Sequence, residues 1–319
     1  MTAQEGFHLS AALDGAGSHP AAPARPFTPQ AYASLVRGAE AGLLDFVTVE
    51  DGPGRLDSAL LLALAATATE RIGLVPLGPT TGDPGTWATR IATLDHLSGG
   101  RAGVRPRVTT SDSERARLVA LFGTPEGDRR LTGLFARADE FLVAATAAWG
   151  TGVEPVQNRP PLAVLAHATV PYRLAAAHAD VVFVTPQDTA GLVTIRKEVE
   201  ALREEAGRPP GSLRVLADLN VVLAAGREAA DERGSRLDEA ARAPFTSDAA
   251  VFTGTPERLA DLLEEWFREG GADGFRLRPA VLPDDLETIT AELVPVLQRR
   301  GLFRTEYTAR TLRGHLRLA

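Results

Sequence analysis

The sequence contains no cysteine, one methionine and a single lysine, Lys197, among its 319 residues. The absence of cysteine excludes disulfide bonds, thiolate metal sites and a cysteine nucleophile. Because there is only one lysine, arginine supplies almost all of the positive charge. The net charge of −7 is spread along the chain. This balance favours solubility and provides no basic face for binding nucleic acid.

Long apolar runs are missing as well. No segment approaches the roughly 20 apolar residues that a membrane-spanning helix needs, and the N-terminal segment lacks the basic start and apolar centre of a signal peptide. Hydrophobic residues make up 44% of the chain, which is enough for one large core. These features predict a globular protein of the cytoplasm with no membrane partner.

Several catalytic motifs are also absent. The sequence has no Gly-Lys-Ser/Thr phosphate loop and no Gly-x-Ser-x-Gly nucleophile turn. Its six histidines form no ligand pair four residues apart on a helix, so no metal site is predicted. Phosphate-loop nucleotide binding, serine hydrolysis of the α/β-hydrolase type and zinc chemistry are thereby disfavoured.

What the chain does contain is a regular alternation of predicted strands and helices. Short apolar runs predict strands at residues 7–13, 45–50, 72–77, 102–108, 162–165, 181–184, 213–223 and 274–277. Helical patterns occupy residues 29–42, 60–69, 84–97, 134–149, 172–179, 196–206, 256–269 and 286–300. Such alternation implies parallel pairing, and the number of units favours a closed (β/α)₈ TIM barrel.

The alternative fold is a doubly wound open sheet, but no glycine-rich dinucleotide fingerprint follows the first strand. We find no internal repeat or low-complexity linker, so residues 1–319 are predicted to form one domain. Two segments interrupt the alternation. Residues 109–132 are loop-like and charged, and residues 224–252 resemble an inserted helical segment.

Three sequence segments carry a family resemblance. They are LDHLSGGR at residues 94–101, TERIGL at residues 69–74 and RRGLFRTEY at residues 299–307. Together they resemble the bacterial luciferase-like flavin-dependent monooxygenases, in the branch that contains nitrilotriacetate and dibenzothiophene-sulfone monooxygenases. The resemblance extends over nearly the whole chain and implies a luciferase-like TIM barrel. It also implies that reduced FMN from a separate flavin reductase is used to oxygenate a small organic substrate.

The first of these segments invites a catalytic interpretation, because it contains Asp95 and His96. It lies, however, between a helix and the following strand, at the end of a barrel that serves stability. Gly99 and Gly100 are typical of a helix C-cap followed by a turn. We therefore interpret His96 and Arg101 as structural residues.

Candidate site residues follow the predicted strands, because a barrel of this kind builds its site at their carboxyl ends. The resemblance implies that Asp51, in the turn after the second strand, lies beside the flavin ring. It places Thr80 and Thr81 near the same ring and His19 close to the substrate. The other interpretation of residues 50–52 is an ordinary strand-ending turn with solvated carboxylates.

The flavin phosphate is expected at the start of the helix after the fifth strand, where free N–H groups and the helix dipole favour an anion. Here Thr169 is the candidate hydroxyl and Arg173 the candidate cation. Tyr172 stands where relatives have a glycine, and its side chain would occupy the space of the phosphate.

Other departures from the family pattern affect the same cofactor. Leu131 and Phe135 stand where relatives have a histidine and a tyrosine that contact the flavin, and the asparagine after the fourth strand has no counterpart. A second hypothesis is therefore a flavin-less, non-catalytic relative that acts as a partner subunit or small-molecule binder. A third, a deazaflavin-dependent oxidoreductase, is disfavoured by the C-terminal signature.

Two further expectations concern coverage and assembly. Between Trp149 and Arg159 the chain is much shorter than its relatives, so the insertion that covers the active site is reduced and the mouth should be more open. The apolar segment 60–68 and the face of Ile91 and Ala92 predict a homodimer, or a heterodimer with a flavin-competent relative. The alternative is that these alanine-rich helices simply pack closely on the barrel.

Overall fold

The computed structural model describes residues 6–23, 28–52, 55–108 and 124–318. Eight parallel strands follow one another around a barrel in the order β4-β3-β2-β1-β9-β7-β6-β5. They are β1 (His8–Ala12), β2 (Phe46–Val49), β3 (Gly73–Pro79), β4 (Arg105–Arg107), β5 (Ala163–Leu165), β6 (Val181–Val184), β7 (Arg214–Leu223) and β9 (Gly274–Pro279). A parallel bridge between Val104 and Leu162 joins the two ends of this row. The prediction of a (β/α)₈ TIM barrel is confirmed.

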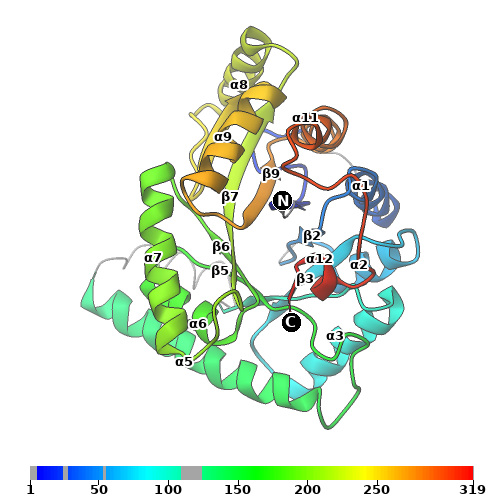
Figure 1. Cartoon of the computed structure of the whole chain (residues 1–319), viewed down its shortest axis with the longest axis vertical. Helices are drawn as coiled ribbons and strands as arrows, with labels where there is room; N and C mark the ends of the chain where they lie inside the picture. Colours follow the sequence, from blue (N-terminus) through cyan, green and yellow to red (C-terminus); the bar gives the residue numbers. More distant parts are fainter. Residues whose placement is uncertain (1–5, 24–27, 53–54, 109–123, 319) are drawn as a thin grey trace.

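Helices surround the strands (Figure 1). They are α1 (Pro29–Ala41), α2 (Ser58–Ala66), α3 (Pro84–Ser98), α5 (Pro125–Ala148), α6 (Thr169–His178), α7 (Thr189–Glu205), α9 (Pro256–Arg268), α10 (Asp284–Thr288), a π-helical turn η1 (Ile289–Leu293) and α11 (Val294–Arg299). Several begin at side-chain caps, as when Thr28 and Asp83 accept N–H groups of the first turn and a proline follows. The start of each of these capped helices is thus encoded locally.

The two segments that interrupt the alternation, 109–132 and 224–252, differ in part from the prediction. Within 109–132, residues 109–123 lie outside the described residues, whereas the remainder enters α5, which begins at Pro125 behind its cap Thr124. The segment 224–252 contains helix α8 (Arg227–Ala241), as predicted, and also most of a ninth strand, β8 (Ala250–Gly254), which pairs with β7. This strand was missed because its exposed Val251 and alternating burial give only a weak apolar signal.

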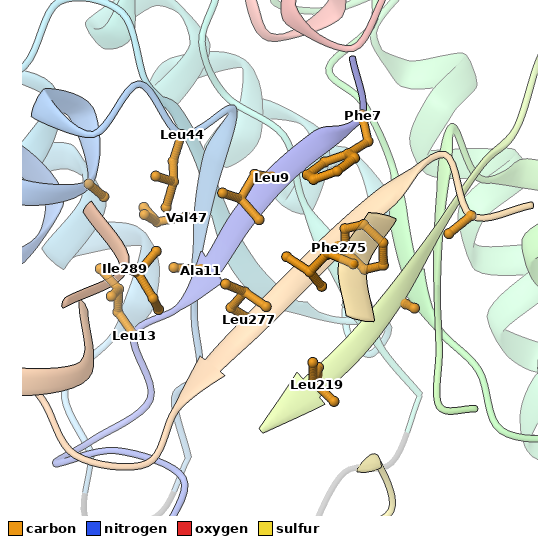
Figure 2. Packing of buried hydrophobic residues seen from close by; sticks show 14 of the residues in the cluster. Phe7, Leu9, Ala11, Leu13, Leu44, Val47, Leu219, Phe275, Leu277 and Ile289 are labelled. Carbon is orange, nitrogen blue, oxygen red and sulfur yellow. The ribbon is translucent and has the colours of Figure 1, made fainter. Parts of the chain in front are cut away.

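The largest core lies between the strands and the helices. Alternate residues of β1, such as Leu9 and Ala11, point outward and pack with Phe275 and Leu277 of β9 (Figure 2). Because successive side chains of a strand face opposite sides, the residues between them face into the barrel. The inward residues divide into an apolar half near the strand starts and a polar half near the strand ends.

A short C-terminal helix, α12 (Leu312–His315), closes the apolar end of the barrel. Leu312 packs there with Phe46 and Phe183. It approaches the backbone of two glycines so closely that an added Cβ at Gly73 would lie 2.5 Å from its Cδ1, and one at Gly103 would lie 2.9 Å from its Cδ2. Glycine is therefore required where α12 meets the strands.

The signature segments meet near this same end of the barrel. The guanidinium of Arg101 donates hydrogen bonds to carbonyl oxygens of Ser98, Ile72, Ala66 and Thr69, which tie the ends of α2 and α3 together. The Asp95 carboxylate accepts hydrogen bonds from the backbone N–H and the side-chain amide of Gln157, and from the backbone N–H of Ala102. The structural interpretation of Arg101 is confirmed.

The proposed Ile91–Ala92 surface is wrong, because these side chains are only 2% and 0% exposed and pack inside the chain. Their cluster joins α3 to α5. On α2, in contrast, Leu60 is 71% exposed and Leu64 is 39% exposed. The apolar face left open to solvent is therefore that of α2.

We expect Gly73→Ala to destabilise the protein by about 1–3 kcal/mol, because the new methyl group collides with Leu312 and Phe46. The matched control is Gly38→Ala in the middle of α1, where nothing lies within 4 Å of the added carbon. That change should stabilise the helix by about 0.5–1 kcal/mol. Urea denaturation of the three proteins measures both effects, and equal midpoints for the two variants would contradict the close approach of α12.

Candidate functional site

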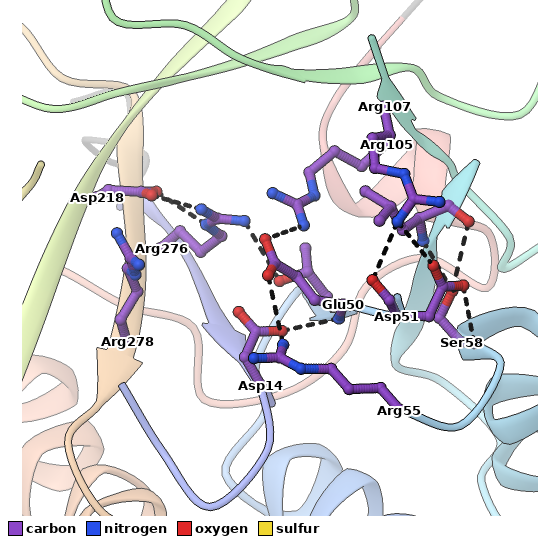
Figure 3. Close-up of polar contacts among 12 residues, drawn as sticks. Asp14, Glu50, Asp51, Arg55, Ser58, Arg105, Arg107, Asp218, Arg276 and Arg278 are labelled. Atoms are coloured by element: carbon purple, nitrogen blue, oxygen red, sulfur yellow. Dashed lines mark hydrogen bonds and ion pairs between the residues drawn. The ribbon is translucent and has the colours of Figure 1, made fainter. Parts of the chain in front are cut away.

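The polar half of the barrel interior opens at the carboxyl ends of the strands. Its side chains come from all eight barrel strands or the turns that follow them: Asp14, Glu50, Asp51, Thr80, Arg105, Arg107, His167, Thr185, Asp218, Arg276 and Arg278. Figure 3 shows the part of this mouth that is richest in charge. Because ion pairs within the set are numerous, the mouth combines strong local charges with an almost balanced total.

Arg276 is the central cation. Its Nε lies 2.8 Å from Asp218 Oδ1, its Nη2 pairs with the other carboxylate oxygen, and its guanidinium lies 4.2 Å from the ring centre of Phe183. Arg276 and Asp218 are 2% and 0% exposed, so each charge depends on the other for compensation. The pair marks the boundary between the apolar and polar halves of the barrel.

Two carboxyl groups next to this pair differ in protonation behaviour. Burial alone would raise the pKa of Glu50, but Arg105, 2.7 Å away, together with Arg276 and Arg55 lowers it to about 2. Burial and the charge of Glu50 raise the pKa of Asp14. Asp14 accepts the N–H of Glu50 at 2.8 Å. Asp14 is therefore the carboxyl group of this pair that holds its proton to higher pH.

The structure brings Asp51 and Thr80 together through Arg107. The Arg107 Nη1 lies 3.1 Å from the Asp51 carbonyl oxygen and 3.4 Å from its Oδ1, while the N–H and hydroxyl of Thr80 both donate to the Arg107 carbonyl. Asp51 also accepts the hydroxyl of Ser58 at 2.8 Å. Thr81 is exposed beside them. The three residues predicted to lie near the flavin ring are thus close together at the ends of β2 and β3.

The predicted phosphate residues have other partners. The Thr169 hydroxyl donates to Glu198 of α7 at 2.5 Å, and Arg173 pairs with Glu205 of the same helix at 2.8 Å. Tyr172 is 3% exposed and belongs to the main core, where burial raises its pKa to about 12. Its side chain is therefore a core side chain, contrary to the expectation that it fills a phosphate site.

His19 is buried in the loop after β1, away from the contacts of Asp51 and Thr80. Its Nδ1 accepts the N–H of Ala21 at 3.1 Å, and its Nε2 lies 3.2 Å from Asp238 of α8. The ring also packs against Phe245, with 4.7 Å between ring centroids. Both ring nitrogens are engaged in holding α8 and the loop that follows it against the β1 loop.

Arg105, Arg107 and Asn220 were not among the predicted flavin or substrate residues. Arg105 Nε, Arg107 Nε and Asn220 Oδ1 are buried and have no hydrogen-bond partner within the described residues. Such atoms are costly unless a ligand or water satisfies them. The available signal was the Arg-Pro-Arg sequence of the fourth strand, whose two arginines share one face.

Two kinds of binding can be assessed directly. Within the described ranges, no three His, Asp or Glu side chains are grouped in a way that could hold a metal ion. Of the helices that the structure describes, none has the length and apolar character needed to cross a bilayer.

Comparison with known proteins defines the class. The family model for luciferase-like monooxygenases matches residues 6–279, and the chain belongs to this family. The chain is 28% identical to nitrilotriacetate monooxygenase component A of Aminobacter aminovorans, an alignment that covers 98% of this chain and 95% of that protein. That alignment spans 437 positions. This exceeds the 319 residues of the chain, so the relative has segments that are missing here.

One further relative and one solved structure are also similar to the chain. Dibenzothiophene-sulfone monooxygenase of Rhodococcus erythropolis is 25% identical over 84% of this chain and 80% of its own length. Among solved structures, EDTA monooxygenase from Chelativorans sp. BNC1 superposes with a TM-score of 0.83 at 20% identity, and the match covers 99% of both chains. The expected relationship to the nitrilotriacetate and dibenzothiophene-sulfone enzymes is confirmed.

We expect Asp218→Asn to destabilise the protein by about 3–5 kcal/mol, because it leaves the buried charge of Arg276 without its counterion. Removing Arg173, whose pair with Glu205 is exposed on both sides, should cost less than about 1 kcal/mol. Chemical denaturation of Asp218→Asn and Arg173→Ala measures the difference. Similar losses in the two variants would show that Arg276 is solvated in the protein.

Proposed function

We propose that this chain is the oxygenase component of a two-component, FMN-dependent monooxygenase that acts on a small organic substrate in the cytoplasm. The observation that carries the proposal is the polar barrel mouth, in a chain whose family consists of luciferase-like monooxygenases. The relative from Aminobacter is named as a component A. A separate flavin reductase is accordingly the proposed partner, and it would supply reduced FMN.

Bound reduced FMN would supply the reaction with dioxygen, whereas the protein positions and shields the reactants. We assign the flavin ring to the neighbourhood of Asp51, Thr80 and Thr81. Arg107 holds the backbone and side chain of Asp51 in this position. Arg105 keeps Glu50 ionised beside this position.

The first turn of α6 provides only part of what a site for the FMN phosphate needs. The first turn of α6 offers the N–H groups of Thr169 and Val170, but Pro171 has none and the Tyr172 N–H is bonded to the Ala168 carbonyl. The carboxylate of Glu198 also takes the Thr169 hydroxyl and would repel a phosphate. With Leu131 and Phe135 in place of polar contacts, this arrangement supports weak binding of FMN.

For His19 we propose a positioning role on the substrate side. Its ring joins the loop after β1 to α8 through Asp238, which is itself bonded to the Phe245 N–H. This loop also bonds to the end of β9, where the N–H groups of Ser18 and His19 donate to carbonyls of Pro279 and Ala280. His19 thus fixes the wall of the mouth without presenting a free nitrogen.

The same features at the start of α6 favour a second candidate function. A chain that retains the barrel but places Glu198 at the anion position would serve as a flavin-less subunit beside a flavin-competent relative. Fold alone does not distinguish this function from catalysis. The distinguishing property is binding of reduced FMN by the isolated chain.

We also propose that the chain forms a homodimer, or a heterodimer with such a relative, through α2. Leu60 and Leu64 lie one helical turn apart on α2, and Leu56, just before the helix, is also 43% exposed. A row of exposed leucines is characteristic of an interaction surface. Ala65, by contrast, is fully buried against the barrel and is unsuitable for testing assembly.

We expect the purified protein to be colourless, because lost hydrogen bonds of about 1.5–3 kcal/mol each weaken FMN binding by orders of magnitude. Glu198→Gln removes the repelling carboxylate and should tighten binding of reduced FMN about tenfold. Glu204→Gln, on the exposed side of the same helix, is the matched control. Anaerobic titration with photoreduced FMN measures these affinities.

The outcomes separate the two functions. Measurable binding of reduced FMN that improves in Glu198→Gln supports the monooxygenase. A yellow preparation with stoichiometric FMN would contradict the incomplete phosphate site. Absence of binding in the wild type and in both variants would favour the flavin-less subunit.

For assembly, Leu60→Glu should convert a dimer into a monomer while the fold is preserved, because the side chain is 71% exposed within the single chain. Val143→Glu on α5 changes an apolar side chain of similar exposure, 54%, and serves as the control. Light scattering at micromolar concentration gives the mass of each. A wild-type monomer, or a dimer that persists in Leu60→Glu, would disprove an α2 interface.

A further inference from the structure

Three side chains from different elements meet at the mouth on the side away from Asp51. His167 follows β5, Thr185 follows β6 and Asp248 precedes β8. The His167 Nδ1 lies 3.0 Å from the Thr185 Oγ1, and its Nε2 lies 3.6 Å from Asp248 Oδ2. A hydroxyl, an imidazole and a carboxylate are therefore arranged in a row.

Asp248 is firmly held in its ionised form. Its Oδ1 lies 2.8 Å from Arg278 Nη1 and accepts the Ser247 hydroxyl at 2.8 Å, and Gln187 holds its carbonyl oxygen. Although burial alone would raise the pKa of Asp248, these donors and His167 hold it far below its usual range. A carboxylate next to Nε2 favours the tautomer with its proton on Nε2.

This tautomer leaves a lone pair on Nδ1, directed towards Thr185. The hydroxyl then donates to Nδ1, which is the orientation that a base needs to take its proton. Partial burial of the ring lowers the pKa of His167, and Arg278 and Arg276 act in the same direction, against the opposing charges of Asp248 and Asp218. His167 is consequently neutral at pH 7 and able to act as a base.

The imidazole also remains accessible. The His167 side chain is 44% exposed, and Thr185 is only partly buried. A small molecule that enters the mouth can therefore approach the hydroxyl. Neither side chain has a part in the proposed contacts to FMN.

We propose that Thr185, His167 and Asp248 form a proton relay that accepts a proton from an O–H or N–H group of a ligand bound in the mouth. In the transfer, the Thr185 O–H bond breaks as a new N–H bond forms at His167 Nδ1. The oxygen of Thr185 simultaneously takes the proton of the ligand, which keeps the electron pair of the broken bond. The imidazolium that results is stabilised by Asp248.

The relay predicts a defined tautomer, which long-range ¹H–¹⁵N correlation NMR of the full chain measures without flavin. The His167 resonances are assigned by their loss in His167→Gln. At neutral pH we expect a neutral ring with its proton on Nε2. Asp248→Asn should lower the pKa of His167 by about one pH unit, because it removes the charge that stabilises the imidazolium.

A chemical probe tests whether the base activates the hydroxyl. With 4-nitrophenyl acetate, the Thr185 oxygen attacks the acetyl carbon, its proton passes to His167 and 4-nitrophenolate leaves. We expect acetylation at Thr185, located by mass spectrometry, to be about a hundredfold slower in His167→Gln. Thr185→Ser should retain the reaction, and Thr185→Val should abolish it.

These results are independent of FMN binding, so the relay and the proposed monooxygenase can fail separately. A proton on Nδ1, or a cationic ring at neutral pH, would overturn the relay. Equal acetylation rates in the wild type and in His167→Gln would overturn it as well, even with the expected tautomer. Circular dichroism of each variant identifies any loss caused by misfolding, and Thr185→Ser then provides the folded comparison.

Discussion

The ion pair between Arg276 and Asp218 organises the interior of this barrel. A closed barrel must fill its interior with side chains, and here the filling changes from apolar to charged at this pair. On the side of the strand starts, Phe46, Phe183 and Leu312 belong to one apolar cluster. On the side of the strand ends, buried charges are possible only because each has a partner, and Glu50 and Arg105 extend the same pattern of compensation towards the mouth.

This division explains where the family resemblance is strong and where it is weak. The signature segments bind backbone groups near the apolar end, as the bonds of Arg101 and Asp95 show. In this chain these contacts hold elements of the barrel together and do not involve the mouth. The residues at the mouth take no part in these contacts, and their side chains face the proposed ligand site. Departures from the family pattern in the first turn of α6 can therefore alter cofactor binding while the fold remains intact.

The candidate site was predictable only in part. Asp51 and Thr80 were found because strand ends in a barrel meet at one face, and the structure places them in contact with the same arginine. Thr169 and Arg173 follow the correct strand, yet both side chains bond to α7. The sequence around α6 contains no information about the carboxylates that a distant helix presents to it. Residue type and position in the chain thus indicated the region but not the partners.

The amino-acid sequence alone determined the alternation of strands and helices, the helix caps and hence the parallel barrel, because these depend on local periodicity and on short-range hydrogen bonds. Only the tertiary structure decided which charges pair. Arg276 and Asp218 are 58 residues apart, and Thr185 and His167 are 18 apart. Their contacts depend on barrel closure and on strand register, which place side chains from separate elements within 3–4 Å. Electrostatic effects act over such distances through space, and the order of residues along the chain does not encode them directly.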